Sequence, residues 1–280
     1  MITYKQFSFD KDYNNVYNFL VNNYSYDRKN GSEAPWLSYT MCNLNQDLIK
    51  NNYIVYDNNK IIAYFGIERN LGECYFFFNN ELLDEMIVKE IVLKAIDLLS
   101  VNEHIIIHLY SKQTKLKKVL KELGFSCTGA WKFYSFDYES EFNYSLNKDF
   151  SFKNIENDLM KIKECIWLGF DNEGINDDIS SIEKIRKLNK HCNLDVFVTN
   201  KNGKLVGYAG VWIDEANKLC YLEPLCVLKE YRHLGIGKAI ISEVIKRSKE
   251  KGCIRITGGI SDFYKRIGFT SLYRQELYEK

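Results

Sequence analysis

One short segment of the sequence combines residue types that bind phosphate. Arg232 is followed by Gly235 and Gly237, where an apolar strand pattern over residues 219–227 gives way to a helical pattern over residues 237–249. The start of a helix offers free backbone N–H groups and the positive end of the helix dipole, and glycines let an anion approach that backbone closely. An arginine adds a donor fork suited to phosphate oxygens. The spacing therefore predicts a seat for a pyrophosphate group.

Two other phosphate-binding loops fit this segment less well. The dinucleotide pattern Gly-x-Gly-x-x-Gly fails because Ile240 stands where the third glycine is required. The pattern Gly-x-x-x-x-Gly-Lys-Ser/Thr does not occur in the sequence. The segment is therefore interpreted as Arg-x-x-Gly-x-Gly.

The elements that must position this loop occur twice in the sequence. Residues 60–67 (KIIAYFGI) match residues 204–211 (KLVGYAGV) at an offset of 144. Residues 120–125 (LKELGF) match residues 264–269 (YKRIGF) at the same offset. Two independent matches at one spacing indicate a duplicated domain.

Each copy shows the same order of predicted elements. A β-hairpin and a third apolar strand precede an amphipathic helix, a short strand, a brief helix and a final aromatic-rich strand. The predicted ranges are 53–56, 61–67, 74–78, 82–99 and 105–109 in the first copy, and 195–199, 205–213, 219–227, 237–249 and 253–257 in the second. This order predicts an α/β fold with a mixed sheet in each of two tandem domains. The boundary is expected in the polar stretch 139–149, which gives domains 1–140 and 150–280.

The second copy resembles the GNAT acyltransferases (GCN5-related N-acetyltransferases) along nearly its whole length. Its Arg-x-x-Gly-x-Gly loop is similar to the cofactor loop of that family, and residues 264–269 match the late motif Tyr-x-x-x-Gly-Phe. The resemblance implies tandem GNAT-like domains, each a mixed, mostly antiparallel sheet flanked by helices, with acetyl-CoA as the cosubstrate and no metal. It implies that residues 225–227 bind the pantetheine arm and residues 232–238 the pyrophosphate. The implied cofactor-binding residues are Leu225, Cys226, Val227, Arg232, His233, Leu234, Gly235, Ile236, Gly237 and Lys238.

Transfer of an acetyl group to an amine requires proton transfers. An alkyl amine has a pKa of about 10.4 and is almost entirely protonated at pH 7, so it needs a base. Glu223 is the only acid within residues 219–227 and is the candidate base, although it could instead pair with Arg232 or Lys229. The resemblance assigns protonation of the departing thiolate to Tyr264, for which core packing is the alternative. A backbone N–H within residues 225–227 is the candidate donor to the oxyanion.

The cysteines and histidines suggest no further chemistry. Cys226 lies where a thioester should pass, but no histidine neighbours it in sequence, so direct transfer is favoured over an acyl-enzyme. The eight cysteines form no Cys-x-x-Cys pair, which disfavours a disulfide or zinc framework. The histidines, at positions 104, 108, 191 and 233, lack a convincing metal-ligand spacing.

The first copy lacks the residues that carry this chemistry. Leu120 stands at the position of Tyr264, and residues 79–85 (NNELLDE) replace the arginine and glycine loop. Three acids in that segment would repel a pyrophosphate. The first copy is therefore predicted to be a degenerate GNAT-like domain without a cofactor loop, with a structural role such as walling the acceptor cleft.

Bulk composition limits the partners. The 38 basic and 37 acidic residues give a net charge of +1, so no global field favours nucleic acid or a membrane surface. Without a leader-like start or an apolar run of eighteen residues, a cytoplasmic location is expected. The acceptor is expected to be a small-molecule amine or a peptide amine, and residues 167–178, with aromatic side chains and four acids, could suit a cationic amine or be a solvated loop.

Three functions remain open at this point. An acetyltransferase is favoured because both Glu223 and Tyr264 are present. A non-catalytic acyl-CoA binding or sensing module would need neither residue. An aminoacyl or long-chain acyltransferase is the third, and the balanced charge disfavours the use of aminoacyl-tRNA.

Overall fold

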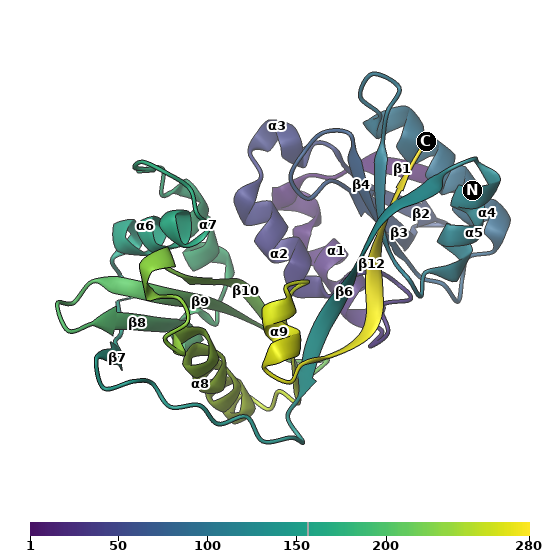
Figure 1. Ribbon diagram of the computed structural model, residues 1–280. Coiled ribbons are helices and arrows are strands. Elements are labelled where there is room, and N and C mark those ends of the chain that lie inside the picture. Colours follow the sequence, from purple (N-terminus) through teal and green to yellow (C-terminus); the bar gives the residue numbers. More distant parts are fainter. Residues whose placement is uncertain (156) are drawn as a thin grey trace. The chain divides into compact units, whose positions relative to one another are not determined.

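The computed structural model describes residues 1–155 and 157–280 as two compact units. Unit 1 comprises residues 1–133 together with residues 271–280, and unit 2 comprises residues 134–270. Each unit has a mixed, mostly antiparallel sheet flanked by helices (Figure 1), which confirms the predicted fold class. None of the helices in the described part of the chain is long and apolar enough to span a membrane.

Unit 1 places helices on both faces of its sheet. The strand order is β1-β2-β3-β4-β5-β12-β6, in which β4 and β5 run parallel. Helices α1, α2 and α3 lie on one side of this sheet and α4 and α5 on the other (Figure 1). The elements are β1 (Ile2–Gln6), α1 (Phe9–Asn22), α2 (Ala34–Asn43), α3 (Gln46–Ile49), β2 (Asn52–Asp57), β3 (Lys60–Gly66), β4 (Glu73–Phe78), α4 (Glu85–Leu99), β5 (Ile106–Tyr110), α5 (Thr114–Glu122), β6 (Ser126–Asp137) and β12 (Thr270–Glu279).

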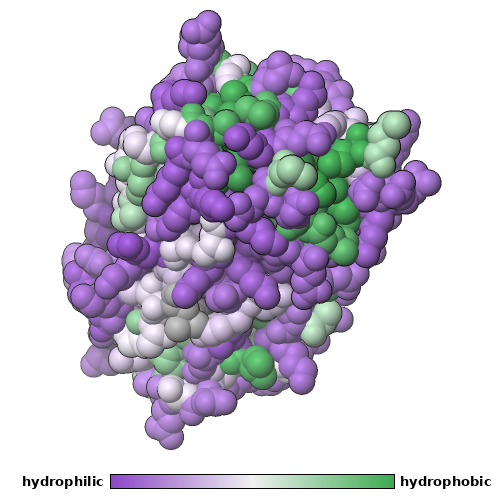
Figure 2. Space-filling view, turned by 90° about the vertical axis from the view of Figure 1, so that its right-hand side faces the viewer, coloured by the Kyte–Doolittle hydropathy of each residue, from purple (hydrophilic) through white to green (hydrophobic). Residues whose placement is uncertain are grey.

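The apolar run of β4 is explained by burial on both faces. Phe76 and Phe78 belong to the core cluster under α4 and α5. Phe77 points the other way and its ring centroid lies 4.7 Å from that of Trp36 in α2. A strand covered on both faces has no solvated positions, so its sequence is continuously apolar. By contrast, the face of the molecule seen in Figure 2 is mainly hydrophilic, with apolar side chains in separate areas.

Unit 2 also has a mixed sheet with helices on both faces. Its strand order is β6-β11-β10-β9-β8-β7, in which β10 and β11 run parallel. Helices α6 and α7 lie on one side of the sheet and α8 on the other (Figure 1). The elements are β7 (Phe150–Phe152), α6 (Leu159–Gly169), α7 (Ser180–Leu188), η1 (Cys192–Leu194), β8 (Val196–Asn200), β9 (Leu205–Asp214), β10 (Leu219–Val227), η2 (Lys229–Tyr231), α8 (Ile236–Glu250), β11 (Arg255–Thr257) and α9 (Asp262–Arg266).

The closing strands are not distributed as the sequence order suggests. In unit 1, β12 of the second copy lies between β5 and β6 and pairs antiparallel with β5, from Gln275 opposite Tyr110 to Tyr278 opposite Ile107. In unit 2, the end of β6 pairs with β11, from Ser135 opposite Thr257 to Asp137 opposite Arg255. The expectation that each copy is closed by its own last strand is therefore wrong. Both strands are long and aromatic-rich, so local pattern does not specify which neighbour each one pairs with.

Candidate functional site

A bulge in β10 shapes one wall of the site. The register between β10 and β9 shifts between Leu222 and Leu225, whereas the parallel pairing of β10 with β11 runs from Leu219 to Tyr221. A bulge bends its strand and increases the local twist. Beyond the bulge, Leu225, Cys226 and Val227 line a cavity in unit 2.

The loop after β10 ends in an open helix start. Gly235 is the N-cap of α8, with φ of 81°, a left-handed conformation that costs glycine little and other residues more. The N–H of Ala239 makes the first bond of the helix, 3.1 Å from the Gly235 carbonyl oxygen. Glycine has no side chain with which to cap a helix. The N–H groups in the first turn of α8, before Ala239, are therefore available to an anion.

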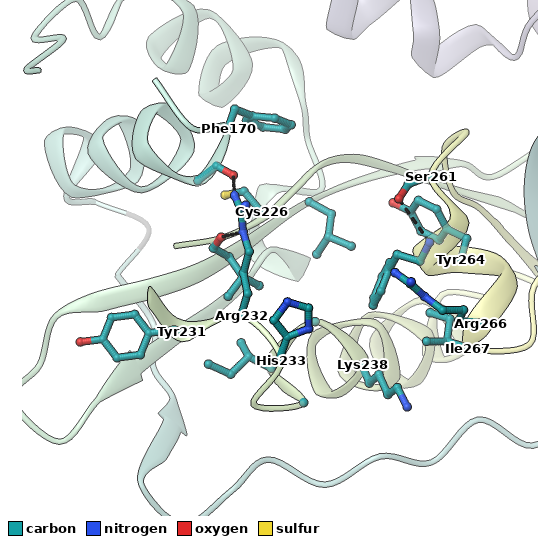
Figure 3. A pocket seen from close by; sticks show the side chains of 17 residues that line it. Phe170, Cys226, Tyr231, Arg232, His233, Lys238, Ser261, Tyr264, Arg266 and Ile267 are labelled. Atoms are coloured by element: carbon teal, nitrogen blue, oxygen red, sulfur yellow. Dashed lines mark hydrogen bonds between the residues drawn. The ribbon is translucent and has the colours of Figure 1, made fainter. Parts of the chain in front are cut away.

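The cavity has a volume of about 920 Å³, and its mainly apolar lining includes the basic residues Arg232, Lys238 and Arg266. Figure 3 shows Lys238 and Arg266 beside it, from α8 and α9, with His233 and Arg232 nearby. It is lined by Gly169, Phe170, Leu225, Cys226, Val227, Tyr231, Arg232, His233, Gly235, Ile236, Gly237, Lys238, Ser261, Phe263, Tyr264, Arg266 and Ile267. All the cofactor-binding residues expected from sequence are in this lining except Leu234, which is half exposed.

Arg232 is held by three protein acceptors. Its Nε–H donates to the carbonyl oxygen of Val227 at 3.1 Å, and Nη2 donates to that of Gly169 at 2.9 Å (Figure 3). Its Nη1 forms an ion pair with Asp171 at 3.0 Å. The hydrogen bond from Arg232 lowers the pKa of the Asp171 carboxyl. Arg232 thus joins the end of β10 to the end of α6.

The two expected catalytic residues lie within electrostatic range of each other. Tyr264, in α9, is 8 % exposed and lines the cavity. Burial raises the pKa of its phenol, and the Glu223 carboxylate raises it further. Glu223 lies in the bulged part of β10 and is half-buried, outside the cavity lining. Its backbone carbonyl accepts a hydrogen bond from Nε1 of Trp212 at 2.8 Å.

Cys226 packs against α6. It is 4 % exposed, and its Sγ donates to the carbonyl oxygen of Cys165 at 3.5 Å. His104 and His108 belong to unit 1, where His108 stacks on Tyr75. Within the described residues, no group of three or more His, Cys, Asp or Glu side chains is placed to hold a metal ion.

Several lining residues were not anticipated from the sequence. Ser261, Phe263, Arg266 and Ile267 flank Tyr264, and the helical spacing of α9 could have indicated them. Gly169 and Phe170, at the end of α6, belong to the segment 167–178 that was expected on the acceptor side, and they line this cavity. Tyr231, in the 3-10 turn before the loop, was not anticipated, and no motif marks it.

In unit 1 the corresponding places are occupied by the chain itself. Gln113 bridges β4 and β5, because its Oε1 accepts from the N–H of Tyr110 at 2.9 Å and its Nε2 donates to the carbonyl of Phe76 at 3.0 Å. The side chain of Asp84 caps α4 by accepting from the N–H of Ile87 at 2.9 Å. This cap explains why α4 begins at Glu85 and not at residue 82. The Gln113 bridge and the Asp84 cap favour the prediction that the first copy has no cofactor loop.

The loop before α4 also presents carbonyl groups to a cation. Lys115 donates hydrogen bonds from its Nζ to the carbonyl oxygens of Asn80 at 2.8 Å and Leu83 at 2.6 Å.

The ladder between β3 and β4 keeps one register from Ala63 opposite Phe78 to Gly66 opposite Tyr75. The bulge that bends β10 thus has no counterpart in this described ladder.

Comparison with known proteins agrees with the geometry of unit 2. Residues 157–269 match the acetyltransferase (GNAT) family. The chain is 30% identical over 89 residues to a glucosamine 6-phosphate N-acetyltransferase of Trypanosoma brucei brucei, covering 29% of this chain and 60% of that protein. It is 26% identical over 142 residues to an uncharacterised N-acetyltransferase of Methanocaldococcus jannaschii, covering 45% of this chain and 63% of that protein. The chain thus spans about three fifths of the length of these relatives.

Solved structures extend the likeness of fold to the whole chain. A tandem GNAT protein from the clavulanic acid biosynthesis pathway has a TM-score of 0.66 at 7% identity, covering 100% of this chain and 98% of that one. A GNAT-family acetyltransferase from Colwellia psychrerythraea has a TM-score of 0.62 at 12% identity and covers 99% of both chains. Residues 157–269 therefore match the GNAT family in sequence, and the fold of the whole chain is similar to that of a tandem GNAT protein.

Proposed function

We propose that this protein is an N-acetyltransferase that moves an acetyl group from acetyl-CoA to a primary amine in a ternary complex. The observation that carries the proposal is the cavity of unit 2, which is lined both by the uncapped start of α8 and by the buried Tyr264. Residues 150–280 are the proposed catalytic copy, and the first copy serves a structural role.

The residues of the cavity fit the parts of CoA. The N–H groups at the start of α8, with Lys238 and Arg266 nearby, suit a pyrophosphate. The backbone beyond the bulge, at Leu225 and Val227, faces the cavity and can hydrogen-bond the amides of a pantetheine arm. Bound acetyl-CoA supplies the thioester whose carbonyl carbon the amine attacks.

Two side chains of the protein are proposed to move the protons. Glu223 accepts a proton from the amine, directly or through a water, as the new C–N bond forms. Tyr264 donates its proton to the sulfur as the C–S bond breaks. The raised pKa of Tyr264 keeps the phenol protonated at neutral pH, which a general acid requires. Cys226 is turned to α6 and is not used as a nucleophile.

The acceptor is proposed to be a small amine. The T. brucei relative is named for glucosamine 6-phosphate, an amino sugar, which makes that class one to test. The acidic segment after α6 would favour a cationic acceptor, although Asp171 within it is already paired with Arg232. A peptide amine is the other class to test.

The full chain should be tested with CoA by calorimetry and with acetyl-CoA and a panel of primary amines by thiol release. The panel should include glucosamine 6-phosphate, a polyamine and a lysine peptide. CoA binding together with amine-dependent thiol release is the expected result. CoA binding without turnover on any amine would favour a non-catalytic acyl-CoA module, and no CoA binding would refute the proposal.

A further inference from the structure

The guanidinium of Arg232 contacts protein groups on both walls of the cavity. On one wall it bonds the carbonyl of Val227, the last residue of β10. On the other it bonds the carbonyl of Gly169, the last residue of α6, and pairs with Asp171 just beyond that helix. Val227 and Gly169 both line the cavity themselves.

The contact with α6 is of a kind that fixes a helix end. The last carbonyls of a helix lack intrahelical partners and carry the negative end of the dipole, so a cation there is stabilising. Gly169 also lies against β10, because a Cβ built on it would stand 2.7 Å from the Cβ of Cys226. Arg232 thus holds the end of α6 close to β10. The helix can come this close because its last residue, Gly169, has no side chain.

The same contact sets the place of Phe170. This residue follows the last residue of α6, lines the cavity and is 52 % exposed (Figure 3). Its backbone lies between Gly169 and Asp171, and Arg232 binds both of those neighbours. The position of the aromatic ring over the cavity therefore depends on the guanidinium.

We infer that Arg232 is a positioning residue, which fixes the end of α6 and Phe170 over the slot for the pantetheine arm, and that it is not a ligand of the pyrophosphate. The inference rests on the proposed use of CoA and goes beyond it by separating the work of the arginine from that of the helix start. Three of the N–H groups of the guanidinium already have acceptors, and Asp171 offsets its charge. The backbone N–H groups of α8 and the Arg266 side chain remain for the phosphates, whereas Nζ of Lys238 lies 5.0 Å from the ring centroid of Tyr144.

The test uses two fragments of CoA: pantetheine, which has no phosphate, and adenosine 3′,5′-bisphosphate, which keeps one phosphate of the pyrophosphate. Binding of CoA, of pantetheine and of adenosine 3′,5′-bisphosphate is measured for the full-length protein and for Arg232→Gln. Loss of hydrogen bonds to a charged group should weaken CoA and pantetheine by the same factor, about tenfold. Binding of the bisphosphate should change by less than about twofold.

Two further variants guard against loss of fold. Asp171→Asn is at an exposed position whose φ of 61° asparagine tolerates, and it should show the same ligand pattern with a smaller loss, about threefold. Asp178→Asn is the matched control, because this exposed aspartate accepts a hydrogen bond from the N–H of Ser180, the first residue of α7. It should bind all three ligands like the unmodified protein.

The possible outcomes are distinct. Weaker binding confined to CoA and the bisphosphate would make Arg232 a phosphate ligand and overturn the inference. Unchanged binding of all three ligands, with only a lower melting temperature, would also overturn it, because the contact would then serve stability alone. Failure of the unmodified protein to bind CoA would refute the proposed function, which is a separate result.

Discussion

The phenol of Tyr264 is buried within electrostatic range of the Glu223 carboxylate, and burial and that charge both raise its pKa. A tyrosine in this state keeps its proton throughout the neutral range. It can donate a hydrogen bond or a proton, and it does not act as a phenolate. The pairing of a protonated phenol with a carboxylate is what acid and base roles in one site require.

Replacement of Tyr264 by phenylalanine separates catalysis from packing. The ring packs closely on Gly258, whose added Cβ would lie 2.7 Å from it, and phenylalanine keeps that contact. If the phenol protonates the thiolate, turnover should fall by about 10²–10⁴ with CoA affinity unchanged. Acyl donors with more acidic thiols should show a smaller deficit. Near-normal turnover where chemistry limits the rate would exclude the acid role.

Replacement of Glu223 by glutamine should preserve CoA affinity and lower turnover, by about 10²–10⁴ at pH 7. The deficit should shrink as pH rises, because the amine then loses its proton unaided. The measurement is a pH–rate profile of both proteins from about pH 6 to 10. Glu230→Gln is a control, since Glu230 is exposed and pairs with Lys204 at 3.0 Å. A constant ratio across the pH range would remove Glu223 from the role of base.

The backbone of Gly235 can be tested against a glycine of the same geometry. Gly235 and Gly203 have φ values of 81° and 77°, and a Cβ on either would have no atom within 4 Å. Alanine at either position should therefore cost a similar backbone strain, about 1–2 kcal/mol. Only Gly235→Ala should weaken CoA binding, by more than about tenfold, because it distorts the start of α8. Equal CoA affinity in the two variants, measured by calorimetry, would contradict the pyrophosphate seat.

Asp195 should make stability depend on pH. Its buried carboxylate accepts from the hydroxyl of Tyr208 at 2.8 Å and pairs with Arg186 at 3.0 Å. Burial raises the pKa of Asp195 to about 6, against about 3.9 in an unfolded chain. Because the pKa of Asp195 is higher in the folded protein, the protonated carboxyl stabilises the fold. This contribution to the free energy of unfolding is fully present below about pH 4 and is lost as pH rises through 6.

Ionisation of Asp195 should lower the free energy of unfolding by about 3 kcal/mol. Urea unfolding between about pH 4 and 7 should be compared for the unmodified protein and Asp195→Asn, since other carboxyls titrate in both. The difference in free energy, unmodified minus variant, should fall across this range. A flat or rising difference would show that Asp195 ionises near its ordinary pKa.

Local patterns predicted most of the elements that build the site. The strand expected over residues 219–227 coincides with β10, and the helix expected over residues 237–249 lies within α8. These elements have strong apolar periodicity and a glycine at the helix start, both of which act locally. The short strands β1 and β7 were not anticipated, because their few residues carry little periodicity.

Contacts between residues far apart in the chain could not be predicted from the sequence. The contacts of Arg232 with Gly169 and Asp171 span 63 and 61 residues. Gln113 in unit 1 joins Phe76 to β5 across 37 residues, and no spacing rule marks it. The partner of β12 depends on which edge is free in the folded unit, which local hydrophobicity does not encode.

The insertion of β12 into unit 1 affects how the protein is made. Gln275 pairs with Tyr110, 165 residues earlier, so β5 cannot meet this partner until the whole second copy has left the ribosome. Until then one edge of β5 must stay unpaired or pair transiently with another strand, and exposed edges invite aggregation. Contacts of such long sequence separation also slow folding. Unit 1 therefore takes its strand β12 from the end of the chain, and a fragment that ends between the copies would lack this strand.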